Sequence, residues 1–235
     1  RSGNNLTGTL TNGADVLNVP QKAISFDGGD YIDAGAGTGN ELRLDGDMTV
    51  ELWVKPDTIS GTQALISLGG KNGDAIAADT YLFGLNLNSS GQLFAFHENG
   101  SSEPGVTTLA TLSAGEWAHV SVTRDVSERT YTVFINGEAI STGTYSNTLD
   151  VVSAATATNA TFKIGSQIDT DGSSLTRTFT GDIADVRVWN TVRTDQQIAD
   201  HYNQAIAGDE GGALVAHYEF NETSGQTVTD TAGNN

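Results

Sequence analysis

The residues best suited to chemistry in this 235-residue sequence are oxygen-bearing side chains in one polar segment. Gln167, Asp169 and Asp171 occupy alternate positions, and Gly172 follows directly. Ca²⁺ takes six to eight oxygen ligands, and an Asp-x-Asp-Gly loop offers several at once. The segment is not an EF-hand, because the glutamate expected at the twelfth position is missing. These residues indicate either a calcium site or a solvated acidic loop.

Carboxylate pairs suited to glycoside hydrolysis are not evident in the sequence. A retaining glycosidase needs two carboxyl groups about 5 to 5.5 Å apart. No Glu-x-Asp-x-Glu run exists, and the three-residue spacing of Asp182 and Asp185 predicts opposite faces of a strand. No Gly-x-Ser-x-Gly elbow or metalloprotease helix motif is present either. We therefore expect a protein that is not an enzyme.

The charge balance excludes several partners. The chain has 29 acidic and 11 basic residues, a formal net charge of −18, and no cysteine. Nucleic acids and anionic membranes are bound by clustered Lys and Arg, so neither is expected as a partner. The lack of cysteine excludes thiol catalysis and disulfides, and no apolar run is long enough for membrane insertion. Because the sequence starts at Arg1, we expect neighbouring domains of a longer chain.

Alternating apolar segments recur along the chain and predict strands. The clearest are 48–54, 64–68, 81–87, 92–97, 117–123, 130–135, 162–164, 182–189 and 214–220. Asn136-Gly137 predicts a tight turn between strands, since both residues tolerate positive φ. This succession indicates one β-sandwich domain over residues 1–235.

One segment has helical periodicity instead. Thr194 and Gln197 form a capping-box pattern at the start of Thr194–Ala207. Ile198, Tyr202, Ala205 and Ile206 fall on one stripe, which predicts a short amphipathic helix near the C-terminal end.

The order of motifs resembles a known family. The motifs are Ile24-Ser-Phe-Asp-Gly-Gly-Asp-Tyr-Ile32, Met48-Thr-Val-Glu-Leu-Trp-Val-Lys-Pro56, Gly115-Glu-Trp-Ala-His-Val120, Val133-Phe-Ile-Asn-Gly137, Ile164-Gly165 and Phe179-Thr-Gly-Asp-Ile-Ala-Asp-Val-Arg-Val-Trp-Asn190. Together they resemble a laminin-G-like or pentraxin-like module of the concanavalin A-like lectin/glucanase superfamily. The resemblance implies an all-β fold: an antiparallel β-sandwich (jelly roll) with one short α-helix. Trp53, Trp117 and Trp189 are then expected to pack in its interior.

The same resemblance bears on calcium. In pentraxins the loop after the corresponding Ile-Gly carries calcium ligands, which places Gln167 and Asp169 near those positions, with Ile168 replacing one ligand. The second half of such a site comes from an earlier loop, here Lys71–Asp79. The expected metal ligands are Asn72, Asp74, Asp79, Gln167, Asp169 and Asp171, and a second structural ion near the chain ends would use Asp27, Asp182 or Asp230. A solvated acidic surface remains the alternative.

The function implied is a calcium-dependent carbohydrate-binding adhesion module of a bacterial extracellular or cell-surface protein. Aromatic rings with a polar group, and side-chain amides, can hydrogen-bond the hydroxyl groups at the edge of a sugar. The expected ligand contacts are therefore Tyr81, His97, Asn99 and Tyr145. The alternative is a non-catalytic structural or peptide-binding module of a bacterial adhesin.

Overall fold

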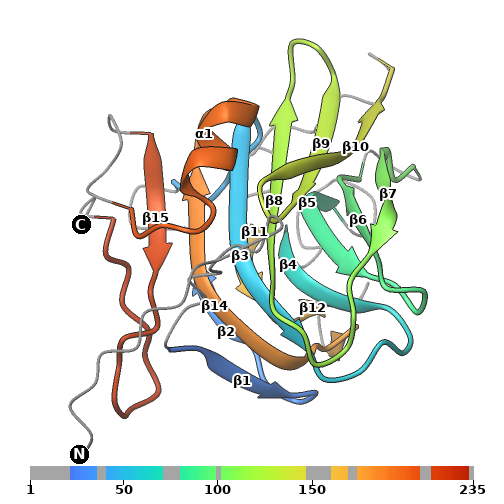
Figure 1. Ribbon diagram of the computed structural model, residues 1–235. Coiled ribbons are helices and arrows are strands. Elements are labelled where there is room, and N and C mark those ends of the chain that lie inside the picture. Colours follow the sequence, from blue (N-terminus) through green and yellow to red (C-terminus); the bar gives the residue numbers. More distant parts are fainter. Residues whose placement is uncertain are drawn as a thin grey trace, which may run out of the picture.

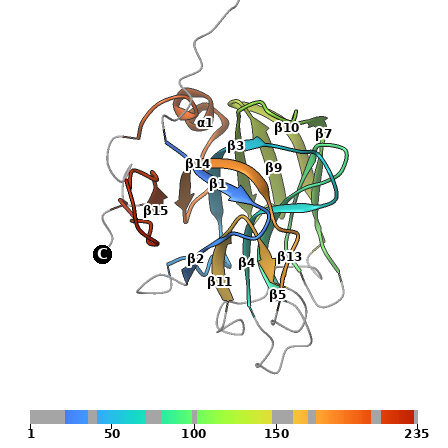
Figure 2. The same cartoon turned by 90° about the horizontal axis from the view of Figure 1, so that it is seen from below.

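The computed structural model describes residues 22–35, 41–70, 80–98, 102–146, 160–168, 174–206 and 213–232. These residues form two antiparallel sheets packed face to face, so the predicted β-sandwich is confirmed (Figures 1 and 2). Sheet A has the order β1-β14-β3-β8-β9-β10, with β15 also paired to β14, and sheet B has the order β2-β11-β4-β5-β6-β7.

The strands of sheet A are β1 (Ile24–Asp27), β3 (Met48–Pro56), β8 (Ala118–Asp125), β9 (Thr130–Ile135), β10 (Glu138–Thr144), β14 (Thr180–Trp189) and β15 (Leu214–Tyr218). Those of sheet B are β2 (Ile32–Gly35), β4 (Gln63–Gly70), β5 (Thr80–Leu87), β6 (Gln92–Phe96), β7 (Gly105–Thr111) and β11 (Ala160–Ile164). A two-stranded ribbon joins β12 (Gln167–Ile168) to β13 (Leu175–Thr176).

The hydrophobic core lies between the sheets. From sheet A, alternate residues such as Val50, Leu52 and Val54 enter it, and from sheet B, residues such as Leu68 and Phe162 do so. All five are fully buried. Because side chains alternate along a strand, each sheet also has an outer face. The side chains and covering elements on these two outer faces differ.

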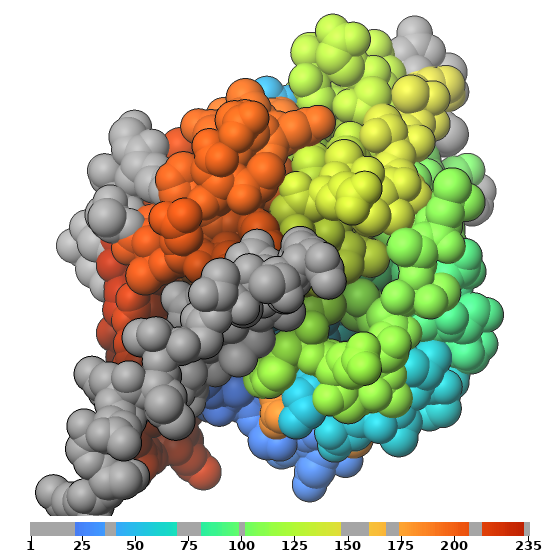
Figure 3. All heavy atoms as spheres, viewed as in Figure 1, coloured from blue at the N-terminus to red at the C-terminus, as the bar shows by residue number. Residues whose placement is uncertain are grey.

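A helix covers part of the outer face of sheet A. Helix α1 (Asp195–His201) begins with the predicted capping box between Thr194 and Gln197. Its residue Ile198 is fully buried, and Tyr202 lies 5.8 Å from the His119 ring of β8. Figure 3 shows this segment in orange against the lime-coloured strands. The helix ends at its cap, Tyr202, earlier than the predicted Ala207.

Strand β14 contains a bulge at Asp185, whose φ is 51°. Asp182 pairs with Lys55 and Arg187 pairs with Glu51, so the inserted residue keeps Asp182 and Arg187 on one face. The carboxylate of Asp185 contacts the Arg187 guanidinium on that same face. The expectation that Asp182 and Asp185 point to opposite faces is therefore wrong, because it assumed a regular strand.

The last described segment folds along the edge of sheet A. After β15 the chain turns back, and Asp230 forms a bridge with Tyr218. The Asp230 carboxylate accepts hydrogen bonds from the backbone N–H groups of His217 and Ala232, both at 2.9 Å. Within the described ranges, no helix has the length and apolarity that a membrane crossing requires.

Candidate functional site

Among the described residues, the outer face of sheet B carries small, polar and aromatic side chains and no helix. Cross-strand partners across it are Lys163, Ser67, Gly84 and Phe96, one from each of four successive strands. Cross-strand partners share a face, and none of these four belongs to the core between the sheets. This row therefore marks the outer face of sheet B, on which Ser67, Phe96 and Lys163 are each no more than 4% exposed.

Three aromatic rings form what we call the aromatic strip on this face: Tyr81, Phe94 and Phe96. Phe94 and Phe96 stack with ring centroids 4.9 Å apart and an interplanar angle of 6°, and Tyr81 lies 6.3 Å from Phe96. Tyr81 and Phe96 are 7% and 1% exposed, whereas Phe94 is half-buried. Phe94 is thus the most accessible ring of the strip.

Glycines allow these rings to lie close to the sheet. A Cβ atom added at Gly69 would sit 2.4 Å from the Tyr81 ring, and one at Gly84 would sit 2.4 Å from the Phe96 ring. Real Cβ atoms do not approach carbon this closely, so both positions need glycine as long as the rings stay in place. The sequence-based reasoning missed Phe94 and Phe96, although glycines inside strands were an available signal of close approach.

The other side of the face is polar. Lys163 is 4% exposed at its side chain and pairs with Asp33 of β2, with Nζ and Oδ2 3.3 Å apart. Ser67 donates from Oγ to the carbonyl of Ser166 at 2.8 Å. Polar groups next to an aromatic surface are the usual lining of small-molecule sites, where they fix ligand orientation.

The predicted ligand contacts fall in different places. Tyr81 belongs to the aromatic strip. His97 and Tyr145 instead lie in an interior cluster with Tyr131: His97 Nδ1 is 2.9 Å from the Tyr131 hydroxyl, and the His97 and Tyr145 rings are 4.8 Å apart. His97 is 0% and Tyr145 is 9% exposed, so both offer a ligand little surface, and the same holds for Tyr81 at 7%. Asn99 lies outside the described residues.

Of the six predicted metal ligands, only Gln167 is described. Its Oε1 accepts a hydrogen bond from Arg177 Nη1 at 3.0 Å, and the residue is 6% exposed. A cation held by this oxygen would have to share it with the Arg177 guanidinium. The other five predicted ligands lie outside the described residues: Asn72, Asp74, Asp79, Asp169 and Asp171.

The two predicted halves of the calcium site attach at opposite ends of β4. Gly165, just before Gln167, donates its backbone N–H to the carbonyl of Leu65 near the start of β4. The segment 71–79 instead joins the end of β4 to the start of β5. A strand of 8 residues spans roughly 25 Å.

The residues proposed for a second ion do not converge. Asp182 Oδ2 is 3.3 Å from Lys55 Nζ, Asp27 accepts from the Gly29 backbone, and Asp230 accepts from the backbone of His217. Over the described ranges, no group of three or more His, Cys, Asp or Glu residues is placed to hold a metal ion.

A buried ionic cluster lies under α1 on the outer face of sheet A. Glu51 is fully buried and pairs with Arg193 (Oε1 to Nη1, 3.1 Å), while His119 Nε2 is 3.4 Å from its other oxygen. Arg193 also stacks on Trp189, with Cζ 4.3 Å from the ring centroid. Since these groups have no opening to solvent, the cluster fastens the helix and offers no binding surface.

The bulge residue Asp185 extends this cluster. It binds Arg187, whose Nη2 also donates to the carbonyl of Gln204 just beyond α1, and it accepts from His217 Nε2 at 2.7 Å. Burial alone would raise the pKa of Asp185, but the His217 hydrogen bond and the Arg187 charge outweigh it and hold the pKa below its ordinary value. Asp185 is therefore an anion that positions Arg187.

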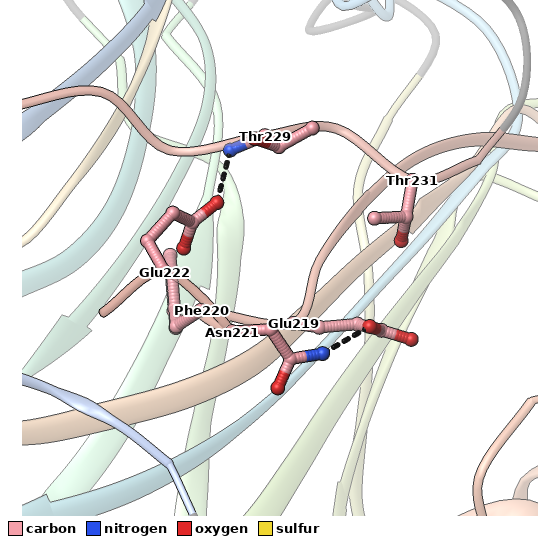
Figure 4. Close-up of a pocket in the computed structure, with 6 residues that line it drawn as sticks. All are labelled: Glu219, Phe220, Asn221, Glu222, Thr229 and Thr231. Carbon is pink, nitrogen blue, oxygen red and sulfur yellow. Dashed lines mark hydrogen bonds between the residues drawn. The ribbon is translucent and has the colours of Figure 1, made fainter. Parts of the chain in front are cut away.

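Two hollows lie on the segment after β15. The first, of about 250 Å³, is lined by Glu219, Phe220, Asn221, Glu222, Thr229 and Thr231 (Figure 4). Glu222 Oε1 accepts from the backbone N–H of Thr229 at 2.7 Å, and Asn221 donates to Glu219. Both carboxylates are thus engaged locally. The second, of about 330 Å³, lies between β2 and residues 226–230.

Comparison with solved structures identifies known proteins that have a similar fold. A similar solved structure is a candidate carbohydrate binding protein from Bacteroides ovatus, with 18% identity and a TM-score of 0.63 over 90% of this chain. The chain spans only 55% of that protein. The CBM40 module of a Ruminococcus gnavus sialidase, solved with α2,3-sialyllactose, is similar at 18% identity and a TM-score of 0.63, over 79% of this chain and 98% of that one.

A heptameric SAP-like pentraxin from Limulus polyphemus is also similar, at 21% identity and a TM-score of 0.51, over 75% of this chain and 79% of that one. At these identities the likeness concerns the fold. A search of curated proteins finds no match. A laminin G family model, described as the concanavalin A-like lectin/glucanases superfamily, matches residues 26–199. With two sheets, a short helix and a match over most of its length, the chain belongs to the laminin G branch of the concanavalin A-like lectin/glucanases superfamily.

Proposed function

We propose that this protein is a non-catalytic carbohydrate-binding module whose ligand lies on the outer face of sheet B. The observation that carries the proposal is Phe94, the half-buried ring of the aromatic strip, which stacks on the buried Phe96. Pyranose rings have apolar C–H faces that pack on aromatic rings, and their hydroxyls bond neighbouring polar groups. Lys163 and Ser67 supply polar groups on the same face.

The similar solved structures support a carbohydrate-binding function. One is described as a candidate carbohydrate binding protein, and another is a CBM40 module holding a sialylated sugar. The opposite sheet is a poorer surface for a ligand, because α1 and the buried cluster around Glu51 occupy part of its outer face. The buried carboxylates Glu51 and Asp185 are both engaged by arginines, which suits structural support better than acid–base chemistry.

A glycan array tests the binding function. Phe94→Ala should weaken every glycan signal, because it removes the most accessible ring of the strip. Leu109→Ala is the matched control: Leu109 is 87% exposed and apolar but belongs to the neighbouring strand β7 outside the strip. Equal loss in both variants, or no glycan signal for the wild type, contradicts the proposal.

We further propose that calcium increases glycan affinity through the predicted acidic segments, and that the module works outside the cell. The support is the sequence pattern, with Asp169 and Asp171 in one segment and Asp74 and Asp79 in another. Isothermal titration of chelator-treated protein should show calcium binding that Asp169→Asn and Asp171→Asn together abolish. If binding is absent below millimolar calcium, or survives this double substitution, the calcium dependence is wrong while the glycan site can stand.

A further inference from the structure

A second candidate sugar site lies away from the aromatic strip, in the larger hollow on the segment after β15. We call this the β2 hollow. It occupies about 330 Å³, the size of a small ligand site. One wall comes from β2 and the residue before it, and the other comes from the turned-back segment. Its principal lining residues are Tyr31, Asp33, Tyr218, Gln226, Thr227 and Asp230.

Tyr31 gives the hollow an exposed aromatic wall. Its side chain is 44% exposed, and across the described residues only Tyr31 and Leu109 are large hydrophobic residues with this much exposure. An exposed ring beside a hollow can stack on the apolar face of a pyranose, and stacking gains more free energy there than on an open surface. A lone surface tyrosine would need no explanation, but one that lines a cavity does.

The base and opposite wall offer hydrogen-bond acceptors. Tyr218 lines the hollow, is 5% exposed, and forms a backbone bridge with Asp230. Burial and the nearby Asp230 charge raise the pKa of Tyr218 to about 12, so its hydroxyl stays neutral. Backbone N–H groups hold Asp230 through Oδ1 alone, leaving Oδ2 available to a ligand hydroxyl.

The charges select the class of ligand. Asp33 and Asp230 both line the hollow, whose lining residues include no Lys or Arg, and Lys163, which pairs with Asp33, is 4% exposed. An anionic sugar would meet two carboxylates with no free cation to offset them. A neutral sugar instead donates its hydroxyls to these acceptors, while Gln226 and Thr227 can both donate and accept.

From this geometry we propose that the β2 hollow binds one neutral hexose unit, without calcium and independently of the aromatic strip. Tyr31 stacks on the apolar face of the sugar. Asp33, Asp230 and Tyr218 accept hydrogen bonds from the hydroxyl groups of the sugar. Sialic and uronic acids are excluded by the two carboxylates. The site thus differs in ligand charge from the sialyllactose that the similar CBM40 module holds.

Amide NMR titration of the whole chain in excess chelator tests this. The probes are the methyl glycosides of glucose, galactose and mannose, with methyl sialoside as the anionic comparison. At least one neutral probe should shift the signals of Gln226, Thr227 and residues 31–34, and methyl sialoside should not. Tyr31→Ala should weaken this binding roughly three- to tenfold, whereas Tyr31→Phe should keep it.

Phe94→Ala separates this site from the aromatic strip, since it should leave the shifts at the β2 hollow unchanged. If neutral probes shift only the amide signals of the aromatic strip, the inference fails while the proposed function stands. If Phe94→Ala abolishes glycan-array binding while neutral probes still shift the amide signals of the β2 hollow, both the proposed function and this inference hold. Shifts produced at the hollow by calcium alone, equal binding of methyl sialoside, or no shift with any probe overturn the inference. Thermal unfolding of each variant confirms that it is folded.

Discussion

Arg193 donates from Nη1 to Oε1 of Glu51 at 3.1 Å, and neither side chain is more than 2% exposed. The pair joins the chain leading into α1 to the middle of β3. Removing one partner of a buried pair leaves the other as an uncompensated charge, which typically costs about 3 to 5 kcal/mol.

Arg193→Leu should therefore destabilise the fold by about 3 kcal/mol or more, measured by urea denaturation. The control is Lys55→Leu, which breaks the partly exposed Lys55–Asp182 pair and should cost under about 1 kcal/mol. Adding Glu51→Leu to Arg193→Leu should recover part of the loss, because it removes the carboxylate that the first substitution leaves without its arginine. Equal effects of the two single substitutions would contradict this account.

The pH dependence of stability should show the contribution of Asp185. Its pKa is lower in the folded state, so the folded protein binds this proton less readily than the unfolded chain. The resulting stability is present above the unfolded pKa of about 3.9 and is lost as pH falls through the lower folded pKa. Denaturation midpoints of the wild type and Asp185→Asn should therefore differ most near neutral pH and converge in acid. A difference that grows in acid would reverse the sign and refute the assignment.

Gly84→Ala should disturb the aromatic strip. The new methyl group would lie 2.4 Å from the Phe96 ring, so the ring must leave its position or the strand must shift. We expect a loss of about 1 to 3 kcal/mol, together with weaker glycan binding. Gly46→Ala is the control, because nothing lies within 4 Å of its added Cβ. Unchanged binding in a folded Gly84→Ala variant would argue against the strip as the ligand surface.

Thr194→Ala should loosen the start of α1. The substitution removes the hydroxyl that accepts from the Gln197 backbone N–H, which typically costs about 1 kcal/mol. The exposed Gln196 in the first turn has no capping role, so Gln196→Ala should be close to neutral. Thermal denaturation compares the two, and equal midpoints would show that the capping box contributes nothing measurable.

Much of the fold could be predicted from local pattern. The alternation at 81–87 and 130–135 corresponds to β5 and β9, and the turn at Asn136-Gly137 has the expected positive φ values of 50° and 81°. The capping box of Thr194 is also confirmed. These features depend on residues close in sequence, which is why a single sequence reveals them.

The remainder depends on contacts between distant segments. Phe94 and Phe96 alternate with Leu93 and Ala95, all four are apolar, and no local pattern says which pair faces the core. Trp189 is buried as expected, yet it lies in a small cluster apart from the main core. Among the predicted site residues, Tyr81 pairs with Gly69 on the outer face of sheet B, and spacing within one segment does not reveal such a pairing between β5 and β4.

The pairing of β14 has a consequence for the two ends of the described fold. β1 and β15 lie on the same edge of β14, at Ile183 and Val186 respectively, and Lys22 donates to the carbonyl of Asn221 at 2.7 Å. The first and last described segments therefore meet along one edge of β14, so that detachment of either would expose part of the strand edge that both cover.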